Sequence, residues 1–191
     1  MSISIKVKEG IAASSWVVNI FEGRSQAGSW DKEMYDFRLG NPKIEPPLAF
    51  VEELKRVANN PFPEMHGYSP LAGHNQTREA IANTLSKERG LPFTAKHVIM
   101  TAGGAGALNI ILKAILNPGD EVIVLSPLYL EYPYYIDNHG GVCSVVETNA
   151  DFTLNIDTIA AKITPRTKAI IINSPNNPTG TIYSEESLKS V

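Results

Sequence analysis

Four short runs of apolar residues dominate the second half of the chain, and predicted helices separate them. The runs are HVIMTA, EVIVLS, VCSVVET and KAIIINS, at residues 97–102, 121–126, 142–148 and 168–174. The helices between them are expected at 107–116, 129–141 and 155–163. Continuously apolar strands that alternate with helices are typical of a parallel sheet buried between two helical layers. We therefore predict an α/β fold, a three-layer sandwich with a mostly parallel sheet.

Residues 1–45 lack this regular alternation. They include a patch rich in glycine and serine, FEGRSQAGSW, and then the run GNPKIEPP. We interpret 1–45 as an N-terminal arm with a small-domain segment, and 46–191 as the first part of a large domain. Two more helices are expected near the start of that domain, at 48–60 and 76–90.

The composition argues against several classes of function. The formal net charge of −3 and the isoelectric point near 5.8 do not suit a nucleic-acid-binding or polybasic membrane surface. No run approaches the roughly 18 apolar residues of a membrane span, and the four histidines show no metal-ligand spacing. The single cysteine, Cys143, cannot form an internal disulfide, which favours a reducing compartment. We expect a cytoplasmic protein with no metal, nucleic-acid partner or membrane contact.

The first predicted strand ends in a glycine-rich turn, TAGGAGAL, at residues 101–108. Parallel sheets bind ligands beyond the carboxyl ends of their strands. Gly103, Gly104 and Gly106 would let the backbone approach a ligand, and the helix that follows offers unpaired N–H groups, which suits a phosphate. A tight turn without a ligand is the alternative. The dinucleotide fingerprint fits poorly, because Asn109 stands where its third glycine belongs.

The second and fourth strands also end in distinctive loops. SPLYLEY places Tyr129 just past the second strand, where an aromatic ring can stack on a flat heterocycle or pack on its own loop. NSPNNPTG presents Asn176 and Asn177 between two prolines. An asparagine side-chain amide can donate a hydrogen bond to a phenolate-like oxygen without adding charge. This loop is the most specific motif in the chain. The tyrosines at 132, 134 and 135 are interpreted as helix packing.

Six motifs occur together in a characteristic order and spacing. They are LGNP, YSPLAG, GGAGAL, NPGDEVIV, SPLY and NNPTG, at residues 39–42, 68–73, 103–108, 117–124, 126–129 and 176–180. This combination resembles the class I and II aminotransferases, pyridoxal 5′-phosphate enzymes of fold type I, from about Phe37 to Val191. The resemblance implies a homodimer that moves an amino group between an amino acid and a 2-oxo acid.

The resemblance implies a role for each matching residue at the cofactor. The turn that begins at Gly103 would hold the cofactor phosphate, with the backbone N–H groups of Gly104 and Ala105 as donors. Many relatives carry a hydroxyl or amide side chain where Ala105 stands, so one phosphate contact is expected to be missing. Tyr129 would stack on the pyridine ring, and Asn177 would hydrogen-bond the ring oxygen.

Further implications concern the substrate, the dimer and the backbone. Gly40 and Asn177 would line the substrate site, with Gly40 against the substrate carboxylate. Tyr68 would reach across a dimer interface to the partner's phosphate. The Ser126-Pro127 and Asn177-Pro178 peptide bonds would be cis. The strand at 97–102 would pair with strands beyond Val191, whereas the other three strands would lie together.

No residue of this chain matches the catalytic lysine of the family. The cofactor chemistry needs a lysine for the Schiff base and a carboxylate that keeps the pyridine nitrogen protonated. In the family both follow the asparagine motif, as does the arginine that grips the substrate carboxylate. We therefore expect no catalytic residue here, and interpret the chain as the amino-terminal part of a longer enzyme, inactive by itself.

Two alternative functions stay open. A β-lyase or another enzyme that eliminates at the α-carbon would use the same loops, because the fold alone does not decide the chemistry. A non-catalytic module that binds a phosphorylated ligand would not require the lysine at all.

Overall fold

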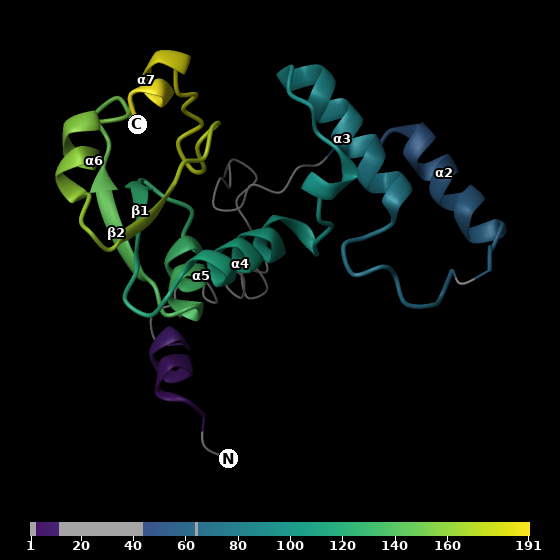
Figure 1. Cartoon of the computed structure of the whole chain (residues 1–191), viewed down its shortest axis with the longest axis horizontal. Helices are drawn as coiled ribbons and strands as arrows, with labels where there is room; N and C mark the ends of the chain where they lie inside the picture. Colours follow the sequence, from purple (N-terminus) through teal and green to yellow (C-terminus); the bar gives the residue numbers. More distant parts are fainter. Residues whose placement is uncertain (1–2, 12–43, 64) are drawn as a thin grey trace, which may run out of the picture. The chain divides into compact units, whose positions relative to one another are not determined.

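The computed structural model describes residues 3–11, 44–63 and 65–191 (Figure 1). The chain divides into two compact units, Met1–Tyr68 and Ser69–Val191, and each is described by itself. Most of the expected N-terminal arm, including Gly40, lies outside the described residues.

The first unit contains helical residues at 5–11 and helix α2, Leu48–Asn59. α2 begins directly after Pro47, as predicted for 48–60, and none of its residues is buried. An ion pair lies on its exposed surface, where the Arg56 guanidinium donates to both carboxylate oxygens of Glu53 at 2.6 and 2.7 Å. Such exposed pairs contribute little to stability.

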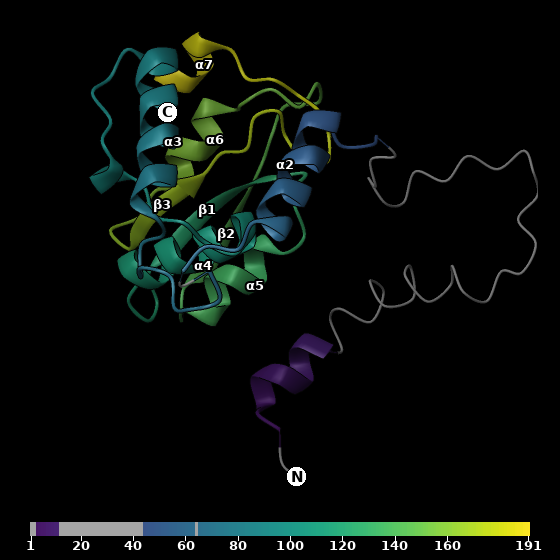
Figure 2. The ribbon, with the colours of Figure 1, turned by 90° about the vertical axis from the view of Figure 1, so that its right-hand side faces the viewer.

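Three parallel strands form the sheet of the second unit (Figure 2). They are β1, Glu121–Ser126; β2, Val142–Glu147; and β3, Thr167–Ile171. Their order is β2-β1-β3, so β1 is central and pairs with a parallel neighbour on each side. The predicted parallel sheet and the predicted grouping of these three strands are confirmed.

The expected strand at 97–102 does not form. A short 3-10 helix, η1, covers Ala95–His97, and the residues after it pair with none of the three strands. A strand needs a neighbour to satisfy its backbone groups. Here Met100 N donates to Ala72 O at 3.0 Å, and the Arg78 guanidinium donates to Val98 O at 2.8 Å. This segment is therefore held by α3 and the loop before it, and the strand prediction was wrong.

Five helices complete the second unit. They are α3, Asn75–Arg89; α4, Gly103–Ile115; α5, Tyr132–Asn138; α6, Ile156–Lys162; and α7, Glu185–Lys189. α4 begins at Gly103, four residues before the predicted start of this helix. α3 ends as its sequence suggests, because Gly90 adopts the left-handed conformation with φ of +67°.

Apolar side chains cover both faces of the sheet. β1 alternates its side chains, so Val122 and Val124 face one layer while Ile123 and Leu125 face the other. On the first face they pack with residues of α4 and α5, namely Leu112, Tyr132, Tyr135 and Ile136. On the second face they pack with Val146, Leu154, Ile159 of α6 and Tyr183. The predicted three-layer arrangement is confirmed for this sheet.

A charged cluster ties the amino end of β1 to the turn before β3. The Glu121 side chain is 9% exposed and accepts from Arg166 Nε at 2.9 Å and from Thr164 Oγ1 at 2.7 Å. The Thr164 hydroxyl and the Arg166 guanidinium hold the pKa of Glu121 below its ordinary value. Glu121 N also donates to Arg166 O at 2.8 Å, which continues the pairing between the two segments.

This cluster predicts a stability that depends on pH. Because the folded pKa of Glu121 is lowered, its contribution is complete above the unfolded value of about 4.3 and is lost as the pH falls through the folded pKa. We expect Glu121→Gln to lower the urea midpoint at neutral pH, and the difference from wild type to shrink below about pH 4. Glu185→Gln, which breaks an exposed pair with Lys189, is the control and should change little. A difference for Glu121→Gln that is independent of pH would contradict this account.

Candidate functional site

The glycine-rich turn forms the beginning of α4. Gly103 has a φ of +76°, a left-handed value that a residue with a Cβ adopts only with strain. Its N–H donates to Thr101 O at 2.9 Å, and Thr101 Oγ1 donates to Gly103 O at 2.9 Å. Gly103 therefore turns the chain sharply from the segment after η1 into the helix.

The first turn of α4 leaves backbone donors free for a ligand. Gly104 and Ala105 have no carbonyl four residues earlier, in α4 or at its cap residue Ala102, to accept from their N–H groups. A Cβ added at Gly103 or Gly104 would meet no atom within 4 Å, so the space beside the turn is open. Free N–H groups at the positive end of a helix dipole favour an anion such as a phosphate.

Tyr129 lies in the loop that follows β1 and is half-buried. Its ring packs against the core cluster that contains Val124, and its centroid is 5.4 Å from that of Tyr132 at an interplanar angle of 75°. Burial and the neighbouring Glu131 carboxylate raise the pKa of Tyr129. The phenol therefore stays neutral at physiological pH.

The two adjacent asparagines after β3 have different environments. Asn176 is buried, and its Nδ2 donates to Pro127 O at 3.2 Å and to Thr179 Oγ1 at 3.0 Å. Asn177 is exposed, and its backbone N donates to Asn173 Oδ1 at 2.8 Å. Asn176 thus fixes the loop, while Asn177 presents its amide at the surface.

The structure brings the Tyr129 loop and the Asn177 loop together. β1 and β3 are parallel neighbours, so the loops after them leave the same edge of the sheet, and the bond from Asn176 to Pro127 O joins them. Within the described residues, no hydrogen bond connects the Gly103 turn to either loop. α4 is linked to this region through Leu108, which packs against the same core cluster as Tyr129.

Two further expectations concern Tyr68 and the proline bonds. Tyr68 is fully exposed and ends the first unit, whereas the other described site residues belong to the second. The Ser126-Pro127 and Asn177-Pro178 bonds are cis, as predicted. The Ser174-Pro175 bond is also cis, which the sequence did not suggest.

The roles of Asn176 and Glu131 are not evident from the sequence. Asn176 and Asn177 stand in one motif, and only burial separates the amide that anchors the loop from the amide at the surface. Glu131 follows Tyr129 by two residues and accepts a hydrogen bond from the hydroxyl of Tyr135. Nothing in the sequence pattern distinguishes this glutamate from an ordinary exposed one.

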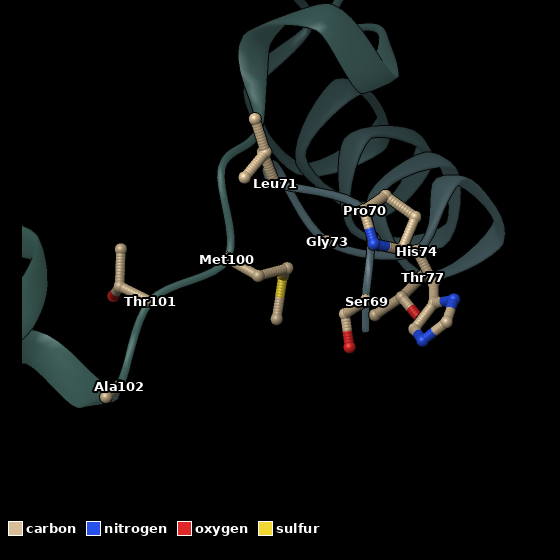
Figure 3. A pocket seen from close by; sticks show the side chains of 9 residues that line it. All are labelled: Ser69, Pro70, Leu71, Gly73, His74, Thr77, Met100, Thr101 and Ala102. Atoms are coloured by element: carbon tan, nitrogen blue, oxygen red, sulfur yellow. The ribbon is translucent and has the colours of Figure 1, made fainter. Parts of the chain in front are cut away.

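A separate hollow of about 530 Å³ lies between the YSPLAG loop, the start of α3 and the segment before α4 (Figure 3). Its lining residues are Ser69, Pro70, Leu71, Gly73, His74, Thr77, Met100, Thr101 and Ala102. Gly73 has a φ of +93°, and a Cβ there would lie 2.3 Å from Met100 Cγ, so only glycine fits beneath this methionine. The predicted site residues Gly103, Tyr129 and Asn177 do not line this hollow.

Metal and membrane features are not found in the part of the chain that the structure describes. No group of three or more His, Cys, Asp and Glu side chains there could hold a metal ion. None of the helices at 3–11, 44–63 or 65–191 combines the length and apolar character needed to cross a membrane.

Comparison with known proteins identifies the family of this chain. The model of the family "Aminotransferase class I and II" matches residues 32–191. The chain belongs to this family. The aspartate/prephenate aminotransferase of Thermus thermophilus is 42% identical to it over 150 residues, and the aspartate aminotransferase of Geobacillus stearothermophilus is 34% identical over 154. These matches cover 77% and 80% of this chain but 39% and 38% of the relatives, so the chain spans about two fifths of their length.

Solved aminotransferase structures resemble this family member along its whole length. An aminotransferase from Eubacterium rectale has a TM-score of 0.91 at 33% identity and covers 99% of this chain, which spans 49% of that structure. A single mutant of Thermus thermophilus aspartate aminotransferase has a TM-score of 0.81 at 36% identity. The match covers 100% of this chain and 49% of that structure. The predicted fold type I architecture is therefore confirmed for the aminotransferase domain present here.

The two asparagines are expected to differ in their effect on stability. Asn176→Ala removes two hydrogen bonds and leaves the Pro127 carbonyl without its donor, so the free energy of unfolding should fall by about 1–3 kcal/mol. Asn177→Ala, the matched control one residue later, removes an exposed side chain and should cost less than about 0.5 kcal/mol. Urea unfolding measures the free energy of unfolding of both variants. An equal decrease in the two would show that the Asn176 side chain does not anchor the loop.

Proposed function

We propose that the protein is a pyridoxal-phosphate-dependent aminotransferase that moves an amino group between an amino acid and a 2-oxo acid. The observation that carries the proposal is the open first turn of α4, whose glycines leave backbone N–H groups free beside unfilled space. The family to which the chain belongs supports the choice of cofactor.

The residues of the second unit fit this cofactor. Gly103 would form the turn, and the backbone N–H groups of Gly104 and Ala105 would hold the phosphate at the positive end of the helix dipole. With a net charge of −3, the protein must attract a phosphate by such a local device. The Tyr129 ring would stack on the pyridine, and the exposed Asn177 amide would donate to the ring oxygen. When bound, the cofactor supplies an electron sink for the bonds at the substrate Cα.

The remaining catalytic groups are proposed to lie outside these residues. Lys113 is exposed in the last turn of α4, and Lys168 is exposed at the amino end of β3, opposite the edge where the Tyr129 and Asn177 loops leave the sheet. Neither is suited to hold the cofactor covalently. The described residues would therefore bind and orient the cofactor, while the lysine and the carboxylate-binding arginine come from elsewhere in the full-length protein.

We propose that the working enzyme is a cytoplasmic homodimer with a role in biosynthesis. Tyr68 supports the dimer because its fully exposed side chain is free to reach a partner's cofactor phosphate. Gly40 and Asn177 would line the substrate site. The single free cysteine, Cys143, supports a reducing compartment. The relatives named for aspartate and prephenate support an amino-acid substrate.

Substitutions at Ala105 should separate phosphate binding from helix stability. A glutamate in the first turn stabilises a helix by about 0.3–1 kcal/mol, yet it would repel a bound phosphate. We expect Ala105→Glu to preserve the unfolding midpoint of the full-length protein and to weaken pyridoxal phosphate binding at least about tenfold. Ala105→Ser should strengthen binding, because it supplies the contact that alanine lacks.

The control for this test is Lys113→Gln at the opposite end of α4. It changes the net charge by the same amount as Ala105→Glu and should leave cofactor affinity unchanged. Spectroscopic titration with pyridoxal phosphate measures all four proteins. If Ala105→Glu binds pyridoxal phosphate as tightly as the wild-type protein does, the phosphate of the cofactor does not bind at this turn.

A further inference from the structure

A third asparagine of the NSPNNPTG loop holds the backbone of Asn177. Asn173 is half-buried, and its Oδ1 accepts a hydrogen bond from Asn177 N at 2.8 Å. Asn173 stands two residues past the end of β3, and the residue before it, Ile172, packs against the core cluster that contains Leu125. The Asn177 backbone is therefore tied to a residue that the sheet itself carries.

The residue before Asn177 is fixed on both sides of its backbone. Asn176 N donates to Thr181 O at 2.8 Å, and Asn176 O accepts from Gly180 N at 2.7 Å. The Asn176 side chain adds its bonds to Pro127 O and Thr179 Oγ1. Of all these hydrogen bonds and the one to Asn173, only the bond to Asn173 ends on Asn177 itself.

The Asn177 side chain, in contrast, is not used to hold the loop. It is exposed, and among the described residues its amide makes no hydrogen bond. Only the two torsions of the side chain separate this amide from a fixed point of the backbone. A donor restrained in this way loses little conformational freedom when it binds a ligand.

We propose that Asn173 is a positioning residue, whose Oδ1 fixes the backbone of Asn177 so that the Asn177 amide is presented to the ring oxygen of the cofactor. This inference rests on the proposed function, because it assumes that Asn177 donates to that oxygen. Asn173 acts through the position of another residue and makes no contact with the ring oxygen itself.

A double-mutant cycle on the full-length protein tests this coupling. The four proteins are wild type, Asn173→Ala, Asn177→Ala and the double variant, each titrated with pyridoxal phosphate. We expect Asn173→Ala to weaken binding roughly 2- to 10-fold, the range of one net hydrogen bond. The double variant should bind no more weakly than Asn177→Ala, because Asn173 has no effect on binding once the amide that it positions is gone.

Asn155→Ala is the matched control. Asn155 is also half-buried, and its Oδ1 accepts from the backbone N of Thr158 at 3.1 Å, at the start of α6. Asn155→Ala and Asn173→Ala thus remove the same kind of hydrogen bond, so a general loss of stability should be similar in both. Asn155→Ala should leave the affinity for pyridoxal phosphate unchanged.

Two further measurements separate positioning from a purely structural role of Asn173. Without cofactor, hydrogen exchange at Asn177 N should be faster in Asn173→Ala than in wild type, and slow again in Asn173→Asp, which keeps an oxygen acceptor. The absorbance spectrum of bound pyridoxal phosphate should change in the same direction in Asn173→Ala and Asn177→Ala, because each variant takes the donor away from the ring oxygen. Asn155→Ala should change neither.

The outcomes distinguish this inference from the proposed function. A wild-type protein that does not bind pyridoxal phosphate defeats the proposed function, and the inference with it. Binding by wild type with no loss in Asn173→Ala defeats the inference alone. An equal additional loss when Asn173→Ala is added to Asn177→Ala would also overturn it, since Asn173 would then act independently of the Asn177 amide.

Discussion

Strand β1 is hydrogen-bonded to a parallel neighbour along both of its edges and is covered by apolar side chains on both of its faces. A backbone buried this completely has to satisfy its polar groups within the sheet, so β2 and β3 are fixed beside it. The parallel direction has a second consequence. All three strands end at one edge, and the loops that follow β1 and β3 must emerge there together.

The proposed cofactor site depends on that shared edge. Asn176 joins the loops after β1 and β3 through the Pro127 carbonyl, so Tyr129 and Asn177 are carried by segments that are tied to each other and to the sheet. Binding groups on such supported loops lose little freedom when a ligand arrives. α4 contributes a different kind of group, backbone N–H donors at an open helix start. Stacking, amide donation and anion binding together match the chemistry of a phosphorylated pyridine.

Much of this arrangement could be predicted from the sequence, and the failures have physical causes. EVIVLS and HVIMTA are similarly apolar, yet only EVIVLS forms a strand, because a strand is defined by its neighbours and not by its own composition. Gly103 was recognisable as a turn residue, although the exact start of α4 was not. The different roles of Asn176 and Asn177 depend on burial, and the hydrogen bond between Glu131 and Tyr135, four residues apart, depends on α5 beginning directly after Glu131. Neither leaves a pattern in the sequence.

The central claim is that pyridoxal phosphate binds at the start of α4 and at the loops after β1 and β3. Hydrogen exchange of the full-length protein, measured residue by residue with and without pyridoxal phosphate, tests it most directly. The account predicts slower exchange of the backbone amides of Gly104 and Ala105 when the cofactor is added. Protection confined to the hollow around Gly73 and Met100, or unchanged exchange at the α4 start, would contradict it.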